Sequence, residues 1–365
     1  MTLPNIKPDP DYQRFVKILS GEVKPKRPPF AELFLDTEHM IGICEEGLRR
    51  KWVPSPGNRE ERARHYDNVI AVYHALGYDY VRVTGNHLDF SSKYRRSKKP
   101  GIDGKIRNWT EEDAGLITTR EEFEAYEWPQ YRDEDAWDFE YVSTHLPDGM
   151  GMVVCPAGGF LEVPLNNLMG YTALCYALTD DPELVSDVFD EVGRRIYDYY
   201  EHVAKLNLPN LFGFFQGDDM GYKGATLISP DDTRRLALKW HKRTAQSAHD
   251  YGLIYMLHSC GNLDSIMEDL IEDVKIDAKH SFEDAIMPVT DFHERYSSRI
   301  GVLGGVDVDA MCRYEPPALR KYIRGVLDAC MPGGRYALGS GNSVANYVPI
   351  SNYFVMLDEG WYYGG

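Results

Sequence analysis

Short apolar segments alternate with longer amphipathic segments along most of this chain. Apolar runs of this length, bounded by glycine or proline, predict buried strands, and the longer patterns with helical spacing predict helices. Because parallel strands are joined by crossovers that usually contain a helix, this alternation predicts a parallel sheet covered by helices. The expected strands occupy residues 30–36, 80–84, 151–155, 211–216, 253–257, 276–279, 300–303 and 336–338.

Helix signals separate most of these strands. Asp181 stands before Pro182 and Ser229 before Pro230, an arrangement typical of the start of a helix. Eight βα units favour a closed (β/α)8 barrel, or TIM barrel, whereas a doubly wound open sheet has the same periodicity and stays an alternative. The chain of 365 residues is expected to form one domain, residues 1–365. The expected helices span residues 61–76, 182–206, 230–249, 263–272 and 317–330.

Residues 89–150 interrupt the alternation. A basic run at 93–107 is followed by an acidic and aromatic run at 121–141. A structureless connection of this length is unusual in a compact domain, so we predict that 89–150 forms a cap inserted over the barrel mouth. Alternatively, the charges of the basic run simply belong to a solvated surface.

The charge balance and the termini exclude several partners. A net charge of −17 argues against nucleic acid, whose phosphates need a basic surface. No run approaches the ~20 apolar residues that a membrane-spanning helix needs, and residues 1–21 lack the apolar core of a signal peptide. We therefore expect a cytoplasmic protein with no membrane or nucleic-acid partner. The 25 tyrosines suit a cavity for a flat organic ligand, although most of these rings should belong to the core.

Polar side chains follow the predicted strands at the ends where TIM-barrel enzymes carry their active sites. The catalytic candidates are carboxylates: Asp218, Asp219 and Glu32. Adjacent strand residues face opposite sides, so only one of the two aspartates is expected to enter the site, while the other could cap a turn. The candidates for substrate binding are Asn86, His87, Tyr222, His280, Asp307 and Asn342.

His258 and Cys260 form the sharpest local motif. Residues two apart in an extended segment share a face, so this imidazole and this thiol would both face the mouth. Nitrogen and thiolate sulfur are the ligands that Zn2+ prefers. The six cysteines show no CxxC pair and, in a reducing compartment, are expected to be free thiols or metal ligands. Against the zinc interpretation, buried cysteine and hydrogen-bonded histidine are also common core residues.

The order of motifs resembles that of the uroporphyrinogen decarboxylase superfamily. The resemblance runs from about residue 30 to the C-terminus and is least in 89–150. It implies a (β/α)8 barrel, in agreement with the strand count. The motifs are Gly158-Gly159-Phe160, Leu168-Met169-Gly170, Asp180 to Val185, Gly217-Asp218-Asp219-Met220-Gly221, Ile228-Ser229-Pro230, His258-Ser259-Cys260-Gly261-Asn262, Gly304-Gly305-Val306-Asp307 and Val348 to Tyr353.

Two branches of this superfamily are relevant. The true decarboxylases use no cofactor and bind a porphyrinogen with many carboxylates through an arginine-rich segment near the N-terminus. The corresponding residues here, 30–36, contain acidic residues and no arginine, which disfavours that branch. The other branch contains corrinoid-dependent methyltransferases, including enzymes that methylate coenzyme M from methylcobalamin and O-demethylases.

The thiol-methylating members of the second branch hold zinc with an HxC pair and a later cysteine. His258 and Cys260 match the pair, but residues 340–342, where the later ligand would fall, contain no cysteine. Asp218, Asp219, Glu32 or water would then complete the zinc site. The resemblance implies methyl transfer between a small methylated substrate, such as a methoxylated aromatic, or a thiol, and cobalamin carried by a separate corrinoid protein.

Three other functions are alternatives to methyl transfer. A cofactor-free decarboxylase of an aromatic or tetrapyrrole acid would need cations in the mouth, for which Arg82 and the 93–107 run are the candidates. A metal-dependent hydrolase could use His258, His280 and the aspartates, although no HxH pair follows an early strand. A non-catalytic corrinoid or tetrapyrrole binding protein is the third. The sequence is compatible with a homodimer.

Overall fold

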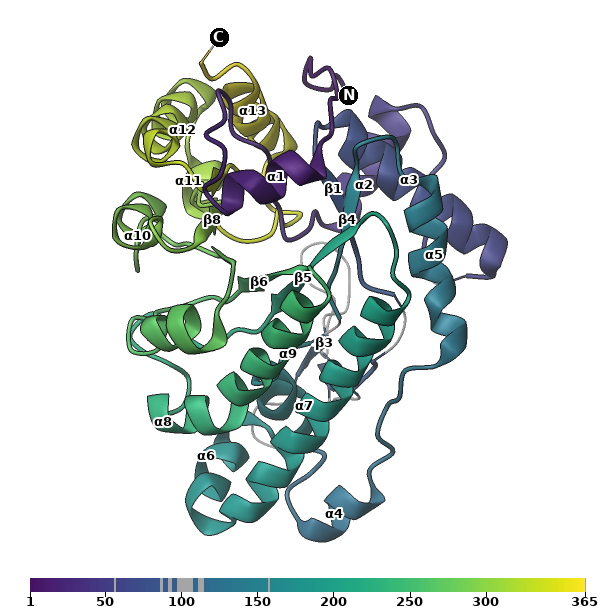
Figure 1. Ribbon diagram of the computed structural model, residues 1–365, viewed down its shortest axis with the longest axis vertical. Coiled ribbons are helices and arrows are strands. Elements are labelled where there is room, and N and C mark those ends of the chain that lie inside the picture. Colours follow the sequence, from purple (N-terminus) through teal and green to yellow (C-terminus); the bar gives the residue numbers. More distant parts are fainter. Residues whose placement is uncertain are drawn as a thin grey trace.

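A computed structural model describes residues 1–55, 57–85, 88–90, 94–96, 108–110, 115–156 and 158–364. Within these ranges the fold is a curled parallel sheet with helices around it (Figure 1). Seven of the predicted strands are confirmed, and neighbouring strands pair in chain order without a reversal. They are β1 (Tyr80–Val83), β4 (Gly151–Val154), β5 (Leu211–Gly217), β6 (Ile254–His258), β7 (Ala278–His280), β8 (Gly301–Leu303) and β9 (Tyr336–Ala337).

The segment predicted as the first strand, residues 30–36, lies beside the chain that follows β9. It forms only single parallel bridges, Phe30 with Leu338 and Leu35 with Val344. On its other side the contact with β1 is a side-chain bond, from the hydroxyl of Tyr80 to the carbonyl oxygen of Glu32 at 3.2 Å. In the described part of the chain no ladder joins this segment to β1, so the sheet is curled but its ladder of strands is not closed.

The inner face of the curled sheet encloses a core of its own. Helix α1 (Tyr12–Leu19) closes the end where the strands begin, since Phe15 and Leu19 belong to the same buried cluster as the inward side chains. The ring of Phe15 lies 5.3 Å from that of Tyr80. The open end is therefore at the carboxyl ends of the strands. Each strand and the 30–35 segment contribute to this inner core: Ala31, Tyr80, Val153, Phe215, Met256, Ala278, Leu303 and Ala337.

The helices cover the outer face, where alternate strand residues such as Val81 and Val83 meet them. The predicted helix starts are confirmed: the side chain of Asp181 accepts from the amide of Leu184, and that of Ser229 from the amide of Asp232. Around the sheet lie α2 (Thr37–Gly42), α3 (Arg59–Ala75), α6 (Tyr171–Asp180), α7 (Pro182–Lys205), α8 (Pro230–Thr233), α9 (Lys239–Asp250), α10 (Val289–Tyr296), α11 (Val308–Arg313), α12 (Pro316–Cys330) and α13 (Ile350–Trp361).

The predicted helix at 263–272 differs from the structure. Its first part is turns, and the longest helical element there is a wide π-helical turn, Asp269–Val274. A π-helical turn, Arg234–Leu238, also joins α8 to α9, within the helix predicted at 230–249. None of the described helices is long and apolar enough to cross a membrane.

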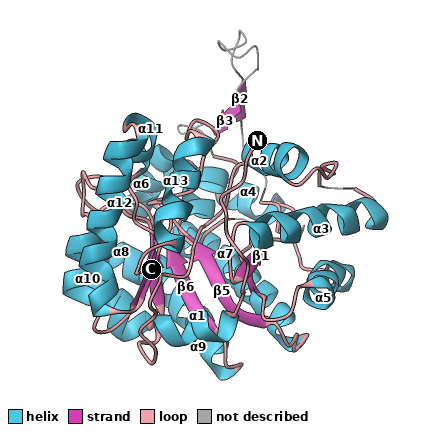
Figure 2. Cartoon of the chain, turned by 90° about the horizontal axis from the view of Figure 1, so that it is seen from above, coloured by secondary structure: helices cyan, strands magenta, loops and turns pink. Residues whose placement is uncertain are grey.

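Residues 89–150 are only partly described. β2 (Tyr94–Arg96) and β3 (Asn108–Thr110) pair antiparallel and project from the end of the molecule opposite α1 (Figure 2). After them come α4 (Arg120–Ala125) and α5 (Ala136–His145), and α5 packs on α3, where Arg62 pairs with Asp138. The predicted segment thus includes a helix of the outer layer, and most of its basic run lies outside the described residues.

Candidate metal centre

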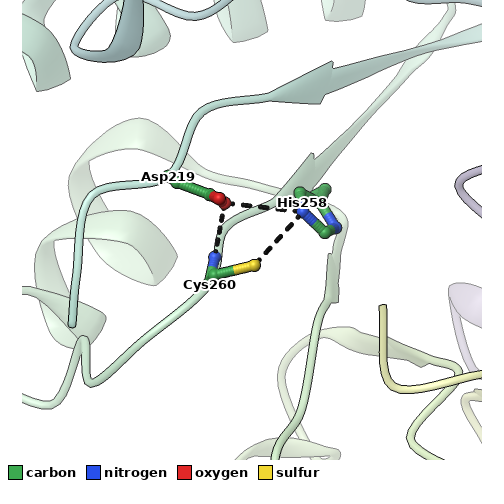
Figure 3. A group of neighbouring side chains, drawn as sticks. All are labelled: Asp219, His258 and Cys260. Carbon is green, nitrogen blue, oxygen red and sulfur yellow. Dashed lines mark hydrogen bonds and ion pairs between the residues drawn. The ribbon is translucent and has the colours of Figure 1, made fainter. Parts of the chain in front are cut away.

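Three side chains that could ligate a metal meet at the carboxyl ends of two adjacent strands. β5 and β6 are paired so that Gly217 lies opposite His258, which brings Asp219 close to that histidine. The Nε2 atom of His258 lies 3.5 Å from the sulfur of Cys260 and 3.4 Å from Oδ1 of Asp219 (Figure 3). The amide of Cys260 donates to the same Oδ1 at 2.8 Å. Asp219, His258 and Cys260 thus form a group whose potential ligand atoms all lie within 4.8 Å of one another.

These spacings fit a zinc ion. Tetrahedral zinc, with bonds of ~2.0–2.1 Å to nitrogen or oxygen and ~2.3 Å to sulfur, holds its ligand atoms roughly 3.3–3.6 Å apart. The two separations from His258 Nε2 fall in or next to that range before any adjustment. Three protein ligands would leave a fourth position for water or substrate, which is the pattern of catalytic rather than structural zinc.

His280 sets the protonation of the histidine ligand. Its Nε2 lies 3.3 Å from the carbonyl oxygen of Ser340, which can only accept, so Nε2 carries the proton and Nδ1 is left as an acceptor. The Nδ1 atoms of His280 and His258 are 2.7 Å apart, so His258 must donate there. Burial, and then the neighbouring His258, lower the pKa of His280 well below its usual range and keep it neutral. With Nδ1 donating to His280, the nitrogen of His258 that can bind a metal is Nε2, which faces Asp219 and Cys260.

Replacing His280 with phenylalanine tests this relay. Phenylalanine keeps an apolar ring near Phe215, whose ring centre is 5.7 Å from that of His280. It removes the acceptor that orients His258. Loss of such a supporting residue costs about 10- to 100-fold in metal affinity. We expect a fall of that size in competition titrations of zinc against a chelator, with an unchanged fold by circular dichroism. An unchanged affinity would contradict the relay.

The sulfur of Cys260 is surrounded by donors. The hydroxyl of Ser281 lies 3.3 Å from it and the amide nitrogen of Asn342 lies 3.2 Å from it. Such contacts stabilise a thiolate. Without a metal, burial and the carboxylate of Asp219 raise the pKa of Cys260 to about 12, so the thiol keeps its proton. Binding of a divalent cation must displace that proton.

This proton gives zinc binding a pH dependence. The thiol of Cys260 has a pKa raised to about 12 and is protonated throughout the neutral range. One proton is then released per zinc bound, and the apparent affinity is expected to rise about tenfold per pH unit between roughly pH 7 and 9. Titrations in buffers of different ionisation enthalpy would count the proton. An affinity that does not change with pH would show that sulfur is not a ligand.

Glu32 is buried and binds the loop after β9 near the metal centre. Its two oxygens accept from the amide of Ser340 at 2.7 Å and contact the Ser340 hydroxyl at 2.5 Å. The segments around Glu32 and Ser340 can come this close because residue 339 is a glycine. A β-carbon at Gly339 would lie 1.7 Å from the carbonyl oxygen of Ala31. Burial raises the pKa of Glu32 to about 8. Glu32 is thus linked to His280 through Ser340 and does not belong to the group of three.

Asp218 points away from the metal centre. It is fully buried, and its carboxylate accepts from the amides of Leu161 and Glu162 at 2.9–3.0 Å and contacts Nε2 of His241 at 2.8 Å. Asp219, on the opposite side of the chain, joins His258. The two neighbouring aspartates therefore have different surroundings, and the structure brings only Asp219 to the metal centre.

The residues predicted to bind substrate lie in different places. Asp307 caps α11 through the amide of Ala310 and also accepts from the amide of Asp284, so both of its oxygens are bonded to backbone. Tyr222 is 53% exposed in the loop after β5. The side-chain nitrogen of Asn342 contacts the sulfur of Cys260, and its side-chain oxygen accepts from the amide of Ser343. Asn86 and His87 lie outside the described residues.

Two charged residues at the site were missed by the sequence analysis. Lys279 is buried on the outer side of β7 and donates to the carbonyl oxygens of Ser259 at 3.4 Å and His280 at 3.2 Å. A lysine inside a predicted apolar strand was the available signal. Glu162 comes from the loop after β4; burial and the carboxylates of Asp219 and Asp218 raise its pKa to about 8. Nothing in the local sequence marked it.

Comparisons with known proteins give a likeness of fold. No protein-family model matches the chain, and a search of curated proteins finds no match. Among solved structures, a methyltransferase from Methanosarcina mazei superposes with a TM-score of 0.66 at 14% sequence identity, covering 95% of this chain and 97% of the other. At this identity the match shows that the two chains share a fold over nearly their whole length.

Proposed function

We propose that this protein is a corrinoid-linked methyltransferase of the uroporphyrinogen decarboxylase superfamily, built as a (β/α)8 barrel with the 30–35 segment as its first strand. The observation that carries the proposal is the group of Asp219, His258 and Cys260 at the carboxyl end of the sheet, with donor atoms spaced as zinc requires. The fold shared with a methyltransferase from Methanosarcina mazei supports the same conclusion.

The residues of this chain have separate tasks in the proposed site. Zinc, when bound, would act as a Lewis acid on the ether or thiol heteroatom that gains charge as the methyl group is transferred. His258, Cys260 and Asp219 would hold it, and Ser281 and Asn342 would donate to the sulfur. The amide of Cys260 donates to Oδ1 of Asp219 at 2.8 Å, a bond that favours the ionised form of this ligand.

The proposed co-reactant is cobalamin carried by a separate corrinoid protein. The proposed substrate is a small methylated compound, such as a methoxylated aromatic, or a thiol. Asp219 is more accessible than His258: 38% of its side chain is exposed, against 6% for His258. The metal would therefore be approached from the side of Asp219.

The test is methyl transfer by the purified protein loaded with zinc. Methylated aromatic ethers and thiols are incubated with reduced cobalamin, and free thiols with methylcobalamin, while the absorption spectrum of the corrinoid is followed. We expect transfer that stops after chelation and returns with zinc, and that is absent in Cys260→Ala. Full activity of Cys260→Ala, or no transfer by the zinc-loaded wild type in either direction, would refute the proposal.

A cofactor-free decarboxylase is the second candidate. The observation that favours it is Arg82, a cation on the inner face of β1. Such an enzyme would release carbon dioxide from an aromatic acid at a rate that chelation does not change. Measuring carbon dioxide and methyl transfer on the same substrates, with and without a chelator, separates the two candidates.

A further inference from the structure

We propose that Arg82 binds the carboxylate of the substrate, so that the methyl compound is an organic acid. The identity of the reaction rests on the function proposed above, but the anion site does not.

Arg82 faces the inside of the curled sheet. In β1 the side chains alternate, and Tyr80 belongs to the inner core while Val81 and Val83 belong to the outer one. Arg82 therefore points inward, two residues closer to the open end than Tyr80. Its side chain is half-buried, and α1 closes the other end of the sheet with Phe15. The metal centre lies at the opposite, open end of the sheet, to which Arg82 is closer than Tyr80 is.

The guanidinium has weak partners. Nη1 lies 3.7 Å from the sulfur of Cys155 and Nη2 lies 3.4 Å from the hydroxyl of Thr84. The guanidinium carbon is 5.0 Å from the centre of the Phe34 ring. Arginine has five N–H donors in a planar fork, and these contacts leave most of them available.

Carboxylates are abundant in this chain, yet the described residues place none within 4.0 Å of this guanidinium. The chain has 57 acidic and 40 basic residues, counting Lys and Arg as basic, and the arginines Arg299 and Arg320, outside the sheet, each contact two carboxylates. A planar fork without an internal carboxylate suits one carboxylate bound by two parallel hydrogen bonds. A single guanidinium matches a monovalent carboxylate better than a phosphate dianion.

The position of Arg82 also sets the size of the acid. β1 and β6 are separated by β4 and β5, so their side chains face each other across the enclosure. Adjacent strands are ~4.8 Å apart, which puts Arg82 and His258 roughly 10–14 Å from each other. A carboxylate at Arg82 and a methyl group at the metal centre are then joined by about one aromatic ring. The geometry points to methoxylated aromatic acids.

The experiment compares 4-methoxybenzoate with 4-methoxybenzamide, which differ in charge and hardly in shape. Binding to the zinc-loaded protein is measured by calorimetry. We expect the acid to bind the wild type roughly 10- to 100-fold more tightly than the amide, the range for hydrogen bonds to a charged group. Arg82→Met is expected to abolish the preference and Arg82→Lys to keep part of it. The control is Arg243→Met, because Arg243 on α9 also lies over aromatic rings, those of Tyr197 and Trp240, but outside the sheet.

Failure of this proposal can be told from failure of the proposed function. Zinc-free Cys260→Ala should keep the preference for the acid, since Arg82 does not touch the metal centre. Equal binding of acid and amide by the wild type, or an unchanged preference in Arg82→Met, would overturn the role of Arg82 even if methyl transfer is observed. A preference for the acid without methyl transfer would support the anion site and refute the methyltransferase. Melting curves identify any variant that fails to fold.

Discussion

Replacing Cys260 with alanine is expected to remove bound zinc. Wild-type protein purified without chelator should contain about one zinc per chain, because nitrogen, sulfur and oxygen donors converge at zinc spacing. The variant loses the sulfur and leaves only His258 and Asp219. The loss of affinity should exceed the ~10- to 100-fold that removal of a supporting residue causes. Elemental analysis of the two proteins measures the effect.

A second cysteine provides the matched control. Cys175, on α6, is a free and exposed thiol. Cys175→Ala should keep full zinc content, which would show that the loss in Cys260→Ala is not a general effect of removing a thiol. Zinc retained in Cys260→Ala, or lost equally in both variants, would contradict the assignment of sulfur as a ligand.

Replacing Asp218 with alanine is expected to destabilise the fold strongly. Three buried donors, the amides of Leu161 and Glu162 and the ring of His241, would lose their acceptor. Breaking a buried charged network by removing one partner costs roughly 3–5 kcal/mol. Urea denaturation should show a loss of unfolding free energy in that range.

Asp219→Ala is the matched variant one residue away. Its carboxylate is partly exposed. Among the described residues, the amide of Cys260 is the one backbone group that donates to it. We expect a loss of stability within about 1 kcal/mol but a large loss of zinc affinity. If Asp218→Ala lost zinc and stayed stable, while Asp219→Ala unfolded, the division of roles between the two aspartates would be wrong.

Much of the fold could be predicted from the alternation of apolar and amphipathic segments. Seven strands and the helices at α3, α7, α9 and α12 were located in this way. The predicted first strand forms no continuous ladder, because Phe30 and Leu35 pair with two separate residues of the segment after β9, Leu338 and Val344. The helix expected at 263–272 became turns followed by a π-helical turn, a change that apolar spacing does not reveal.

The metal centre was predictable only where its residues are neighbours in sequence. His258 and Cys260 are two residues apart, and strand geometry placed both on one face. The choice of Asp219 over Asp218 required the pairing of β5 with β6. The role of His280 depends on the distance of 2.7 Å between its Nδ1 atom and that of His258. No sequence pattern encodes that contact.

Zinc K-edge X-ray absorption of the zinc-loaded wild type tests the central claim most directly. A site built from Cys260, His258 and Asp219 predicts one sulfur at ~2.3 Å and the remaining ligands, nitrogen or oxygen, at ~2.0–2.2 Å. A sulfur lost in Cys260→Ala would confirm its source. Two or more sulfur ligands, or a shell without sulfur, would contradict the metal centre proposed for this protein.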